Sequence, residues 1–226
     1  MSKINLIIPA AGTSNRFQST IPKQFHVLDG KTILEHTLSA FKDIQLEDCL
    51  IAVNKNTEEK VHDILEKLSF SARTVRGGDT RAESVREAFY EAKESDITLI
   101  HDAARMCLTR PLIERVIDAA WRYDAVIPAI PVTDTIKKVQ KDRVIKTLTR
   151  DDLVAVQTPQ AFKTASLRRA YEDYYDKSIT DEASLLESAG KTVHIIKGES
   201  DNIKVTYPLD LEYVRNYIKK NNNNNN

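Results

Sequence analysis

Residues 4–12 of the chain read INLIIPAAG. The uncharged apolar run that opens this stretch predicts a buried β-strand. The strand ends in small residues that let a ligand approach the backbone closely, namely Ala10, Ala11 and Gly12. The loop that follows carries two cations, Arg16 and Lys23. Exposed backbone amides beside fixed positive charge suit a polyphosphate, whereas the alternative interpretation is an ordinary first strand and a polar turn.

The composition limits the classes of function. The 226 residues include 33 Lys and Arg against 33 Asp and Glu, so the formal net charge is zero, and a general affinity for nucleic acid is not expected. Two cysteines, Cys49 and Cys107, lack the spacing of metal ligands and suit a reducing compartment. No apolar run approaches the ~20 residues that a membrane helix needs, and no secretory signal is visible. We therefore expect a cytoplasmic protein without a membrane or nucleic-acid partner.

Apolar runs alternate with helical patterns along the chain. The runs that predict strands lie at 4–10, 49–53, 73–76, 97–100, 125–130 and 192–196. Apolar residues at 61–68 and at 85–92 recur with helical spacing, and Thr80 with Glu83 forms a capping-box pattern before the second of these helices. The alternation predicts an α/β, Rossmann-like fold with a mostly parallel, twisted sheet flanked by helices. Ligands bind such sheets beyond the carboxyl ends of the strands.

Two segments depart from this alternation. Residues 135–139 and 143–148 are short, β-branched, lysine-rich runs with three residues between them, which predicts a hairpin within an arm at about 133–152. A hairpin of two strands is marginally stable alone, so we expect it to pack against a partner chain or over the site; a solvated insertion is the alternative. The asparagine run at 221–226 is expected to be disordered. We expect 1–220 to form a single domain.

A second group of candidate residues lies between the strand at 73–76 and the capped helix. Gly77 and Gly78 can expose amides at a helix N-terminus, which suits the flat edge of a base or an anion. The hydroxyl of Ser84, one turn into the helix, can add a further contact. A tight turn before a capped helix, with no ligand, is the alternative.

A third group follows the strand at 97–100. Asp102 stands where a parallel strand ends, the place at which a metal or a substrate hydroxyl is held. Ala103 leaves room beside it, and Arg105 can meet an anion or pair with Asp102. We interpret His101 as structural, because the sequence offers it no clear partner carboxylate or nucleophile.

Lys204 is the one charged residue in an Ile-Lys-Val frame, so it either extends to solvent or points into a phosphate site. The segment 180–182 is best explained as a helix N-cap with acidic residues in the first turn. Cations, small residues and one carboxylate at a strand end are equipment for positioning and for neutralising charge. Such equipment suits transfer at phosphorus.

With these pieces assembled, the chain resembles the 2-C-methyl-D-erythritol 4-phosphate cytidylyltransferases of the non-mevalonate isoprenoid pathway. The resemblance covers about the whole length except the asparagine tail. The matching segments are, in order, 9–12 with Arg16, 22–24, 77–79 with Arg81, 101–105, 134–135, Arg150, 157–160, 180–184 and 201–206. Ser14 and Met106 depart from the family pattern, which usually has glycine and proline there.

The resemblance implies a nucleotidyltransferase-type fold and a role for each matching residue. The implied catalytic cations are Arg16, Lys23 and Lys204. The implied nucleotide-binding residues are Ala10, Ala11, Gly12, Gly77, Gly78, Asp79, Ser84, Asp102 and Ala103. The implied acceptor-binding residues are Asp102, Arg105, Thr135, Arg150 and Lys204, with Thr135 and Arg150 on an arm that reaches the partner subunit's site. Asp102 is also the candidate metal contact, although the phosphates of CTP are expected to hold most of the ion.

The reaction implied is transfer of CMP from CTP to the sugar-alcohol phosphate 2-C-methyl-D-erythritol 4-phosphate, with Mg²⁺ or another divalent cation as cofactor. The products are 4-diphosphocytidyl-2-C-methyl-D-erythritol and pyrophosphate, and the enzyme is expected to be a homodimer joined through the arm. Two alternatives stay open. A ribitol 5-phosphate cytidylyltransferase shares the fold and the nucleotide half, and a non-catalytic nucleotide-sensing module is conceivable because a fold does not fix a function.

Overall fold

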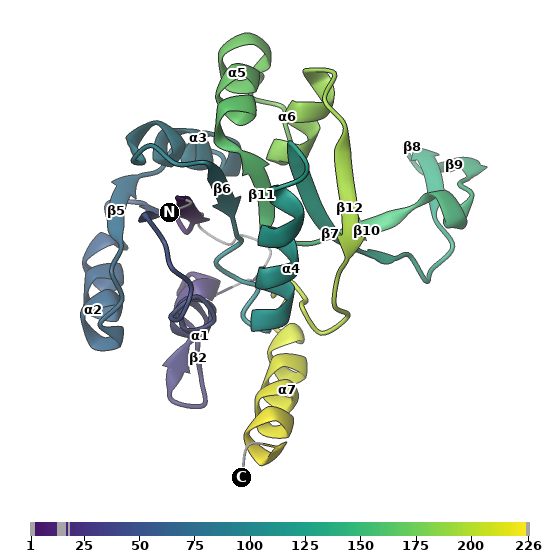
Figure 1. Cartoon of the computed structure of the whole chain (residues 1–226). Coiled ribbons are helices and arrows are strands. Elements are labelled where there is room, and N and C mark those ends of the chain that lie inside the picture. Colours follow the sequence, from purple (N-terminus) through teal and green to yellow (C-terminus); the bar gives the residue numbers. More distant parts are fainter. Residues whose placement is uncertain (1–2, 13–16, 18, 225–226) are drawn as a thin grey trace.

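The computed structural model describes residues 3–12, 17 and 19–224, so the predicted cation Arg16 lies outside the described residues. One eight-stranded sheet has the order β10-β7-β11-β6-β1-β4-β5, and β12 pairs with β7 (Figure 1). Its strands are β1 (Ile4–Pro9), β4 (Asp48–Val53), β5 (Arg73–Arg76), β6 (Ile97–Ile100), β7 (Ala125–Pro131), β10 (Val154–Val156), β11 (Gln160–Lys163) and β12 (Val193–Lys197). Strands β10 and β11 run antiparallel to their neighbours and the other pairs are parallel. The mostly parallel α/β sheet predicted from the sequence is confirmed.

Helices cover both faces of the sheet (Figure 1). They are α1 (Ile33–Ser39), α2 (Glu58–Leu68), α3 (Arg81–Glu91), α4 (Arg110–Ala120), α5 (Thr164–Tyr174), α6 (Glu182–Ser188) and α7 (Asp210–Asn224). In β1, Leu6 and Ile8 belong to the core shared with α1, α2 and α4, whereas Ile7 belongs to the core shared with α3, α5 and α6. A strand buried on both faces reads as a continuous apolar run, which explains the opening sequence.

A third, smaller apolar cluster joins segments that are far apart in the sequence. It contains Phe17, Leu28, Ile33, Ala104, Met106, Cys107, Val205 and Val214. The small hairpin of β2 (Val27–Leu28) and β3 (Lys31–Thr32) contributes to it, and so does α7. Met106 is 6% exposed here, so the residue that replaces the family's usual proline fills apolar space. The cluster packs together the loop after β1, the loop after β6 and the segment before α7.

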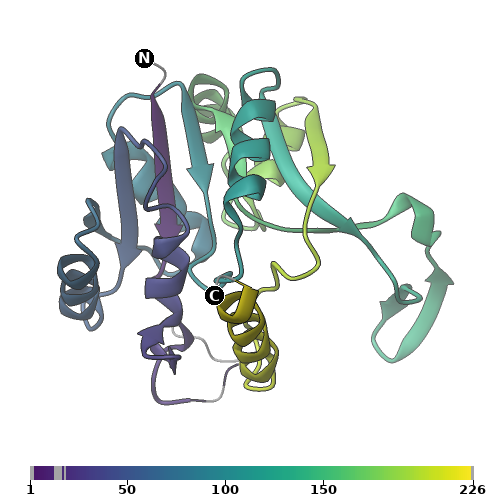
Figure 2. The same cartoon turned by 60° about the horizontal axis from the view of Figure 1, so that its bottom comes forward.

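The predicted hairpin is present as β8 (Lys137–Gln140) and β9 (Arg143–Thr147), which form a separate two-stranded sheet. It projects away from the body of the molecule on an extended arm, as both views show (Figures 1 and 2). Every residue of both strands is exposed. The arm therefore lacks a core of its own in the described part of this chain.

The structure departs from the sequence-based expectations at three places. Strands β10 and β11 were not predicted, because the first is exposed and the second is only four residues long and contains Gln160 and Lys163. Helix α7 continues to Asn224, whereas disorder was expected from Asn221. A helix that is already nucleated adds residues at little cost, and this explains the extension. Within the described ranges, no helix is long and apolar enough to cross a membrane.

Candidate active site

A cleft of about 580 Å³ opens where β1, β4, β5 and β6 end at their carboxyl ends. Its lining includes most of the residues predicted from the sequence: Ala10, Ala11, Gly12, Lys23, Gly77, Gly78, Asp79, Ser84, Asp102, Ala103 and Lys204. Four lining residues were not predicted, namely Asn54, Lys55, Asn56 and Arg76. Asn54 and Lys55 come directly after β4, and β4 lies parallel to β1. Because parallel strands end at the same edge of a sheet, the prediction of a strand at 49–53 could have placed these two residues beside Gly12.

Two side-chain amides hold the small residues after β1 in place. Gln24, which is buried, donates from Nε2 to the Ala10 carbonyl at 2.8 Å. Asn54 donates from Nδ2 to the Ala11 carbonyl at 2.9 Å. With both carbonyls engaged by protein donors, the orientation of the peptide planes at this edge of the cleft is fixed. The chain beyond Gly12 passes into residues that are not described.

Gly77 brings the next wall close to the first. A Cβ at this position would lie 2.6 Å from the Ala11 Cβ and 2.7 Å from the Ser84 Oγ. At Gly78, a Cβ would lie 2.4 Å from the Glu83 Cβ. Both glycines are therefore required by the close approach of neighbouring side chains, a reason different from the exposure of amides that the sequence suggested.

The amides of the glycine turn are less available than predicted. The Gly77 N–H donates to the Val53 carbonyl at 2.8 Å, and the Asp79 and Thr80 amides donate to Glu83 Oε2 in the capping arrangement that the sequence predicted. The expectation that Gly77 presents its own amide to a ligand is wrong, because β4 uses that amide. Among the described residues, no backbone acceptor is found for the Gly78 N–H, so its contact with a ligand stays a prediction.

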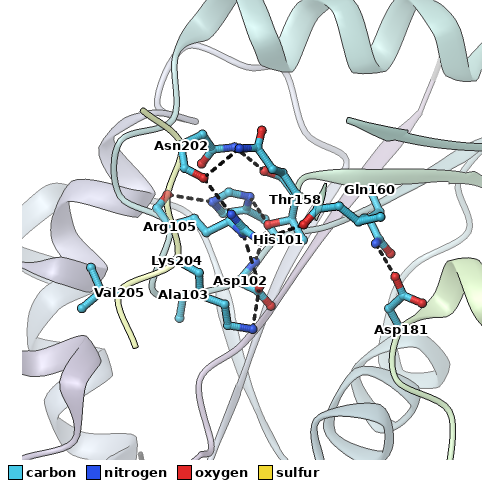
Figure 3. A network of polar contacts seen from close by, with 12 residues as sticks. His101, Asp102, Ala103, Arg105, Thr158, Gln160, Asp181, Asn202, Lys204 and Val205 are labelled. Carbon is cyan, nitrogen blue, oxygen red and sulfur yellow. Dashed lines mark hydrogen bonds and ion pairs between the residues drawn. The ribbon is translucent and has the colours of Figure 1, made fainter. Parts of the chain in front are cut away.

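Three cationic side chains surround the Asp102 carboxylate at the cleft. Its Oδ2 lies 2.9 Å from Lys204 Nζ (Figure 3) and 3.5 Å from Arg105 Nε. Its Oδ1 lies 3.1 Å from Arg81 Nε. Burial alone would raise the pKa of this carboxyl, yet the three cations hold its pKa well below the usual range. Asp102 is therefore ionised under all ordinary conditions.

This arrangement argues against the metal role predicted for Asp102. Both carboxylate oxygens already contact cations, so a divalent ion bound there would face three positive groups at close range. Among the described residues, no group of three or more His, Cys, Asp and Glu side chains is arranged to hold a metal. Asp102 instead fixes the ammonium group of Lys204 at the edge of the cleft.

Arg105 is used mainly to hold the protein together. Its Nη1 donates to the Asn202 carbonyl at 2.7 Å and its Nη2 to the Val156 carbonyl at 3.1 Å. The side chain is largely buried, and burial lowers the pKa of its guanidinium despite the nearby Asp102. Arg105 does not line the cleft in the way that Lys204 does, and a contact between Arg105 and an acceptor stays a prediction.

His101 is fully buried beneath the site. Its Nδ1 lies 2.9 Å from the Thr158 hydroxyl, and its Nε2 lies 3.1 Å from the Arg105 carbonyl (Figure 3). Burial lowers the pKa of this imidazole to about 4, so it is neutral at pH 7. The Arg105 carbonyl can only accept, so the proton of His101 is on Nε2. Nδ1 then accepts from the Thr158 hydroxyl, whose oxygen accepts from the Asp102 amide at 3.1 Å. The structural role predicted for His101 is consistent with these contacts.

Lys23 and Lys204 lie on different segments that meet at the cleft. Lys23 begins the 3-10 turn η2 (Lys23–Phe25), and its Nζ donates to the Val205 carbonyl at 2.6 Å. The backbone next to Lys204 is therefore fixed by the other predicted lysine. The chain that follows Val205 is also fixed. The Asp210 carboxylate accepts from the Thr206 and Tyr207 amides at 2.7 and 2.9 Å.

The two predicted residues of the arm do not reach this cleft. Arg150 donates from Nη1 to the Thr133 carbonyl at 2.8 Å, and both Arg150 and Thr135 are exposed. Neither lines the cleft of its own chain. Their predicted action in a partner subunit's site is untested by these contacts.

Fixed cations, a close glycine turn and a carboxylate that orients a lysine can position a triphosphate and neutralise its charge. The fold and this cleft together define a nucleotidyltransferase. The chain belongs to the 2-C-methyl-D-erythritol 4-phosphate cytidylyltransferase (IspD) family, whose model matches residues 4–220. It is thus a cytidylyltransferase of the non-mevalonate isoprenoid pathway.

Individual relatives agree with the family match. The chain is 39% identical to the 2-C-methyl-D-erythritol 4-phosphate cytidylyltransferase of Alkaliphilus metalliredigens, over 93% of this chain and 90% of the relative. It is 38% identical to the enzyme of the same name from Haemophilus ducreyi, over 96% of both chains. Among solved structures, the 4-diphosphocytidyl-2C-methyl-D-erythritol synthase of Anaerococcus prevotii superposes with a TM-score of 0.84 and 30% identity, over 96% of this chain and 99% of that one.

Proposed function

We propose that this chain transfers CMP from CTP to 2-C-methyl-D-erythritol 4-phosphate. A phosphate oxygen of the acceptor attacks the α-phosphorus of CTP, and the bond from the α-phosphorus to the bridging oxygen breaks, so that pyrophosphate leaves with the electron pair. A phosphate monoester is already largely a dianion near neutral pH, since its second pKa is about 6. The protein therefore needs no general base, and its task is to bring two anions together.

The observation that carries this proposal is the meeting of Lys23 and Lys204 at one cleft, with Lys23 Nζ bound to the Val205 carbonyl at 2.6 Å and Lys204 Nζ held 2.9 Å from Asp102. In our proposal these ammonium groups, together with Arg16, neutralise the triphosphate and the charge that develops on the α-phosphate. Removing one such preorganised group typically costs about 3 kcal/mol of transition-state stabilisation.

The glycine turn is the proposed place of the cytosine. Gly77, Gly78, Asp79 and Ser84 all line the cleft, and in this proposal the Gly78 amide contacts the base. The Ser84 hydroxyl donates to the Thr80 carbonyl at 2.8 Å, so it would meet the base as an acceptor. Ala10, Ala11, Gly12 and Ala103 would lie against the sugar and phosphates, because their small side chains leave the backbone accessible.

A divalent cation, Mg²⁺ or a similar ion, would be held chiefly by the phosphates of CTP in this proposal and would supply further positive charge when bound. The engagement of Asp102 by three cations supports this placement. The remaining parts of the proposal concern organisation: a single domain, a homodimer joined through the arm that brings Thr135 and Arg150 to the partner subunit's site, and a cytoplasmic location. Exposed apolar side chains on the arm, Val139, Val144 and Ile145, support an arm that is covered in the assembly.

The test is pyrophosphate release from CTP and Mg²⁺ with one acceptor at a time. We expect fast release with 2-C-methyl-D-erythritol 4-phosphate and slow release with ribitol 5-phosphate. Faster release with ribitol 5-phosphate would reassign the acceptor. If no pyrophosphate is released with either acceptor, although the protein still binds CTP, the nucleotide-sensing alternative would be favoured.

A further inference from the structure

Glu182 carries a buried charge behind the wall of the cleft. It is fully buried at the start of α6 and does not line the cleft. Its Oε2 accepts from Arg81 Nη1 at 2.9 Å, and its Oε1 accepts from the Tyr171 hydroxyl at 3.3 Å. Capping does not explain this orientation, because Asp181 is the residue that accepts from the Ser184 amide at the helix N-terminus.

The start of α6 is fixed in position against the sheet. Gln160 of β11 donates from Nε2 to Asp181 Oδ2 at 2.7 Å (Figure 3). Glu182 is the next residue, so its carboxylate has little freedom to follow Arg81 if Arg81 moves. The ion pair is therefore a fixed point for the guanidinium rather than a loose surface contact.

Arg81 divides its guanidinium between two carboxylates. Its Nε contacts Asp102 Oδ1 at 3.1 Å while its Nη1 contacts Glu182. An arginine beside a single carboxylate tends to bind both oxygens as a planar fork. Glu182 instead binds Nη1, away from the edge that faces Asp102, and so fixes the orientation of the guanidinium. In this orientation Arg81 contacts Asp102 through Nε and Oδ1, and Asp102 Oδ2 contacts Lys204 at 2.9 Å.

We propose that Glu182 is a positioning residue for the cytidylyl transfer: by holding Arg81, it reserves Asp102 Oδ2 for Lys204 and so fixes the Lys204 ammonium in the cleft. This inference rests on the proposed function for its effect on catalysis. Its structural half, the placement of Lys204, stands on the contacts alone.

The charges of the cluster show what the loss of Glu182 does. Two carboxylates, Glu182 and Asp102, balance most of the charge of three cations. Without the Glu182 charge, Asp102 is the one carboxylate of the cluster that remains for the three cations. The cations then repel one another in a partly buried environment, where charge repulsion is only weakly screened by water. Lys204 is the cation that leaves, because its side chain is 35% exposed against 25% for Arg81 and 11% for Arg105.

The test is Glu182→Gln with Glu187→Gln as the matched control, since Glu187 is an exposed glutamate of the same helix. We expect Glu182→Gln to lower kcat by ~10-fold or more with a smaller change in KM for CTP, as for loss of a preorganised charge. We also expect Lys204 in the substrate-free protein to react several-fold faster with an amine-acylating reagent, measured by peptide mass spectrometry. Glu187→Gln should change neither.

A double-mutant cycle separates positioning from general damage. In a Lys204→Ala background, Glu182→Gln should cost less than ~2-fold, because the residue through which it acts is gone. Equal costs in the two backgrounds, or unchanged labelling of Lys204, would overturn the proposal. If Glu182→Gln does not fold, Glu182→Asp keeps the charge and withdraws the carboxylate by one methylene, and the same outcomes apply. If the wild-type protein releases no pyrophosphate, the proposed function fails, while the labelling of Lys204 still decides the positioning role.

Discussion

Lys23 donates its ammonium group to the carbonyl of Val205 at 2.6 Å, across 182 residues of sequence. The contact ties the loop after the first strand to the segment that carries Lys204. The apolar cluster beneath these loops, which includes Val205, holds the same segments together. Lys23 and Lys204, which the sequence suggested separately, are thus held together by this hydrogen bond and by the apolar cluster. A substitution at Lys23 is therefore expected to affect the position of Lys204 as well.

The Lys23→Ala variant is predicted to lose catalysis while staying folded. We expect kcat to fall by ~100-fold or more, because a preorganised charge at the triphosphate is removed and the backbone beside Lys204 loses its anchor. Steady-state pyrophosphate release and circular dichroism check both parts. Lys31→Ala, an exposed lysine of β3, is the control and should behave as the wild type. A loss of only a few-fold would remove Lys23 from the mechanism.

The glycine turn should make the enzyme selective for a small base. We expect CTP to be strongly preferred over ATP and GTP, because Gly77, Ala11 and Ser84 close tightly on one another. Gly77→Ala should reduce kcat/KM for CTP by ~10-fold or more, since its Cβ would meet Ala11 and Ser84 at distances that force the wall to move. Comparable turnover with a purine triphosphate would show that the turn does not hold the base.

Magnesium binding should depend on the nucleotide. Both oxygens of Asp102 are engaged by Arg81 and Lys204, and Mg²⁺ sites usually combine one or two carboxylates with substrate phosphates. The protein alone should therefore bind Mg²⁺ weakly, and CTP should tighten the binding. Isothermal titration calorimetry with and without CTP measures this. Tight binding in the absence of nucleotide is the result that would contradict it.

The sequence predicted the parts of the fold that local pattern decides. The sequence located Ile97–Ile100 at its observed bounds because this strand is a buried, mostly apolar run. It also located Arg73–Arg76, a partly exposed strand whose end is marked by the glycine pair and the capped helix that follow it. Strand β11 carries no such mark, since its place depends on antiparallel pairing with β6 and β7. Pairing of that kind is decided by tertiary contacts, which override local propensity.

The candidate site was predictable where residues lie at strand ends. Ala10–Gly12, Gly77–Gly78 and Asp102 follow three strands that run parallel, so the rule for doubly wound sheets brings them together. Glu182 was interpreted as a helix residue, because nothing in its neighbours indicates an ion pair with Arg81, 101 residues away. Gln24 and Gly77 likewise act through contacts that only the folded chain creates.

Buried His101 should make the folded state sensitive to acid. Burial lowers the pKa of this imidazole from 6.5 to about 4, so below pH 6.5 the unfolded chain takes up a proton that the folded chain refuses. The contribution of neutral His101 to the free energy of unfolding is fully present above pH 6.5 and is lost as the pH drops toward 4. The free energy of unfolding should fall by about 2 kcal/mol between pH 7 and pH 5 for this reason. Urea unfolding at the two pH values gives the slope. His101→Gln should remove this part of the slope, and equal slopes in the two proteins would contradict the prediction.

The arm offers a test of whether one active site uses two chains. Arg150 lies on the exposed arm, outside the cleft of its own chain, whereas Lys23 lines that cleft. In a two-fold dimer joined through the arm, Lys23 serves its own chain's site and Arg150 serves the partner's. Lys23→Ala and Arg150→Ala homodimers should therefore both be nearly inactive in pyrophosphate release.

Unfolding and remixing the two variants in equal amounts should restore activity. Random pairing makes about half of the dimers mixed, and each mixed dimer has one site with both lesions and one site with neither, so about a quarter of the wild-type sites return. Each variant refolded alone is the control and should stay inactive. The extent of exchange is measured with subunits that carry different tags. If tagged subunits exchange and no activity returns, Arg150 does not act across the interface, and the site is built from one chain.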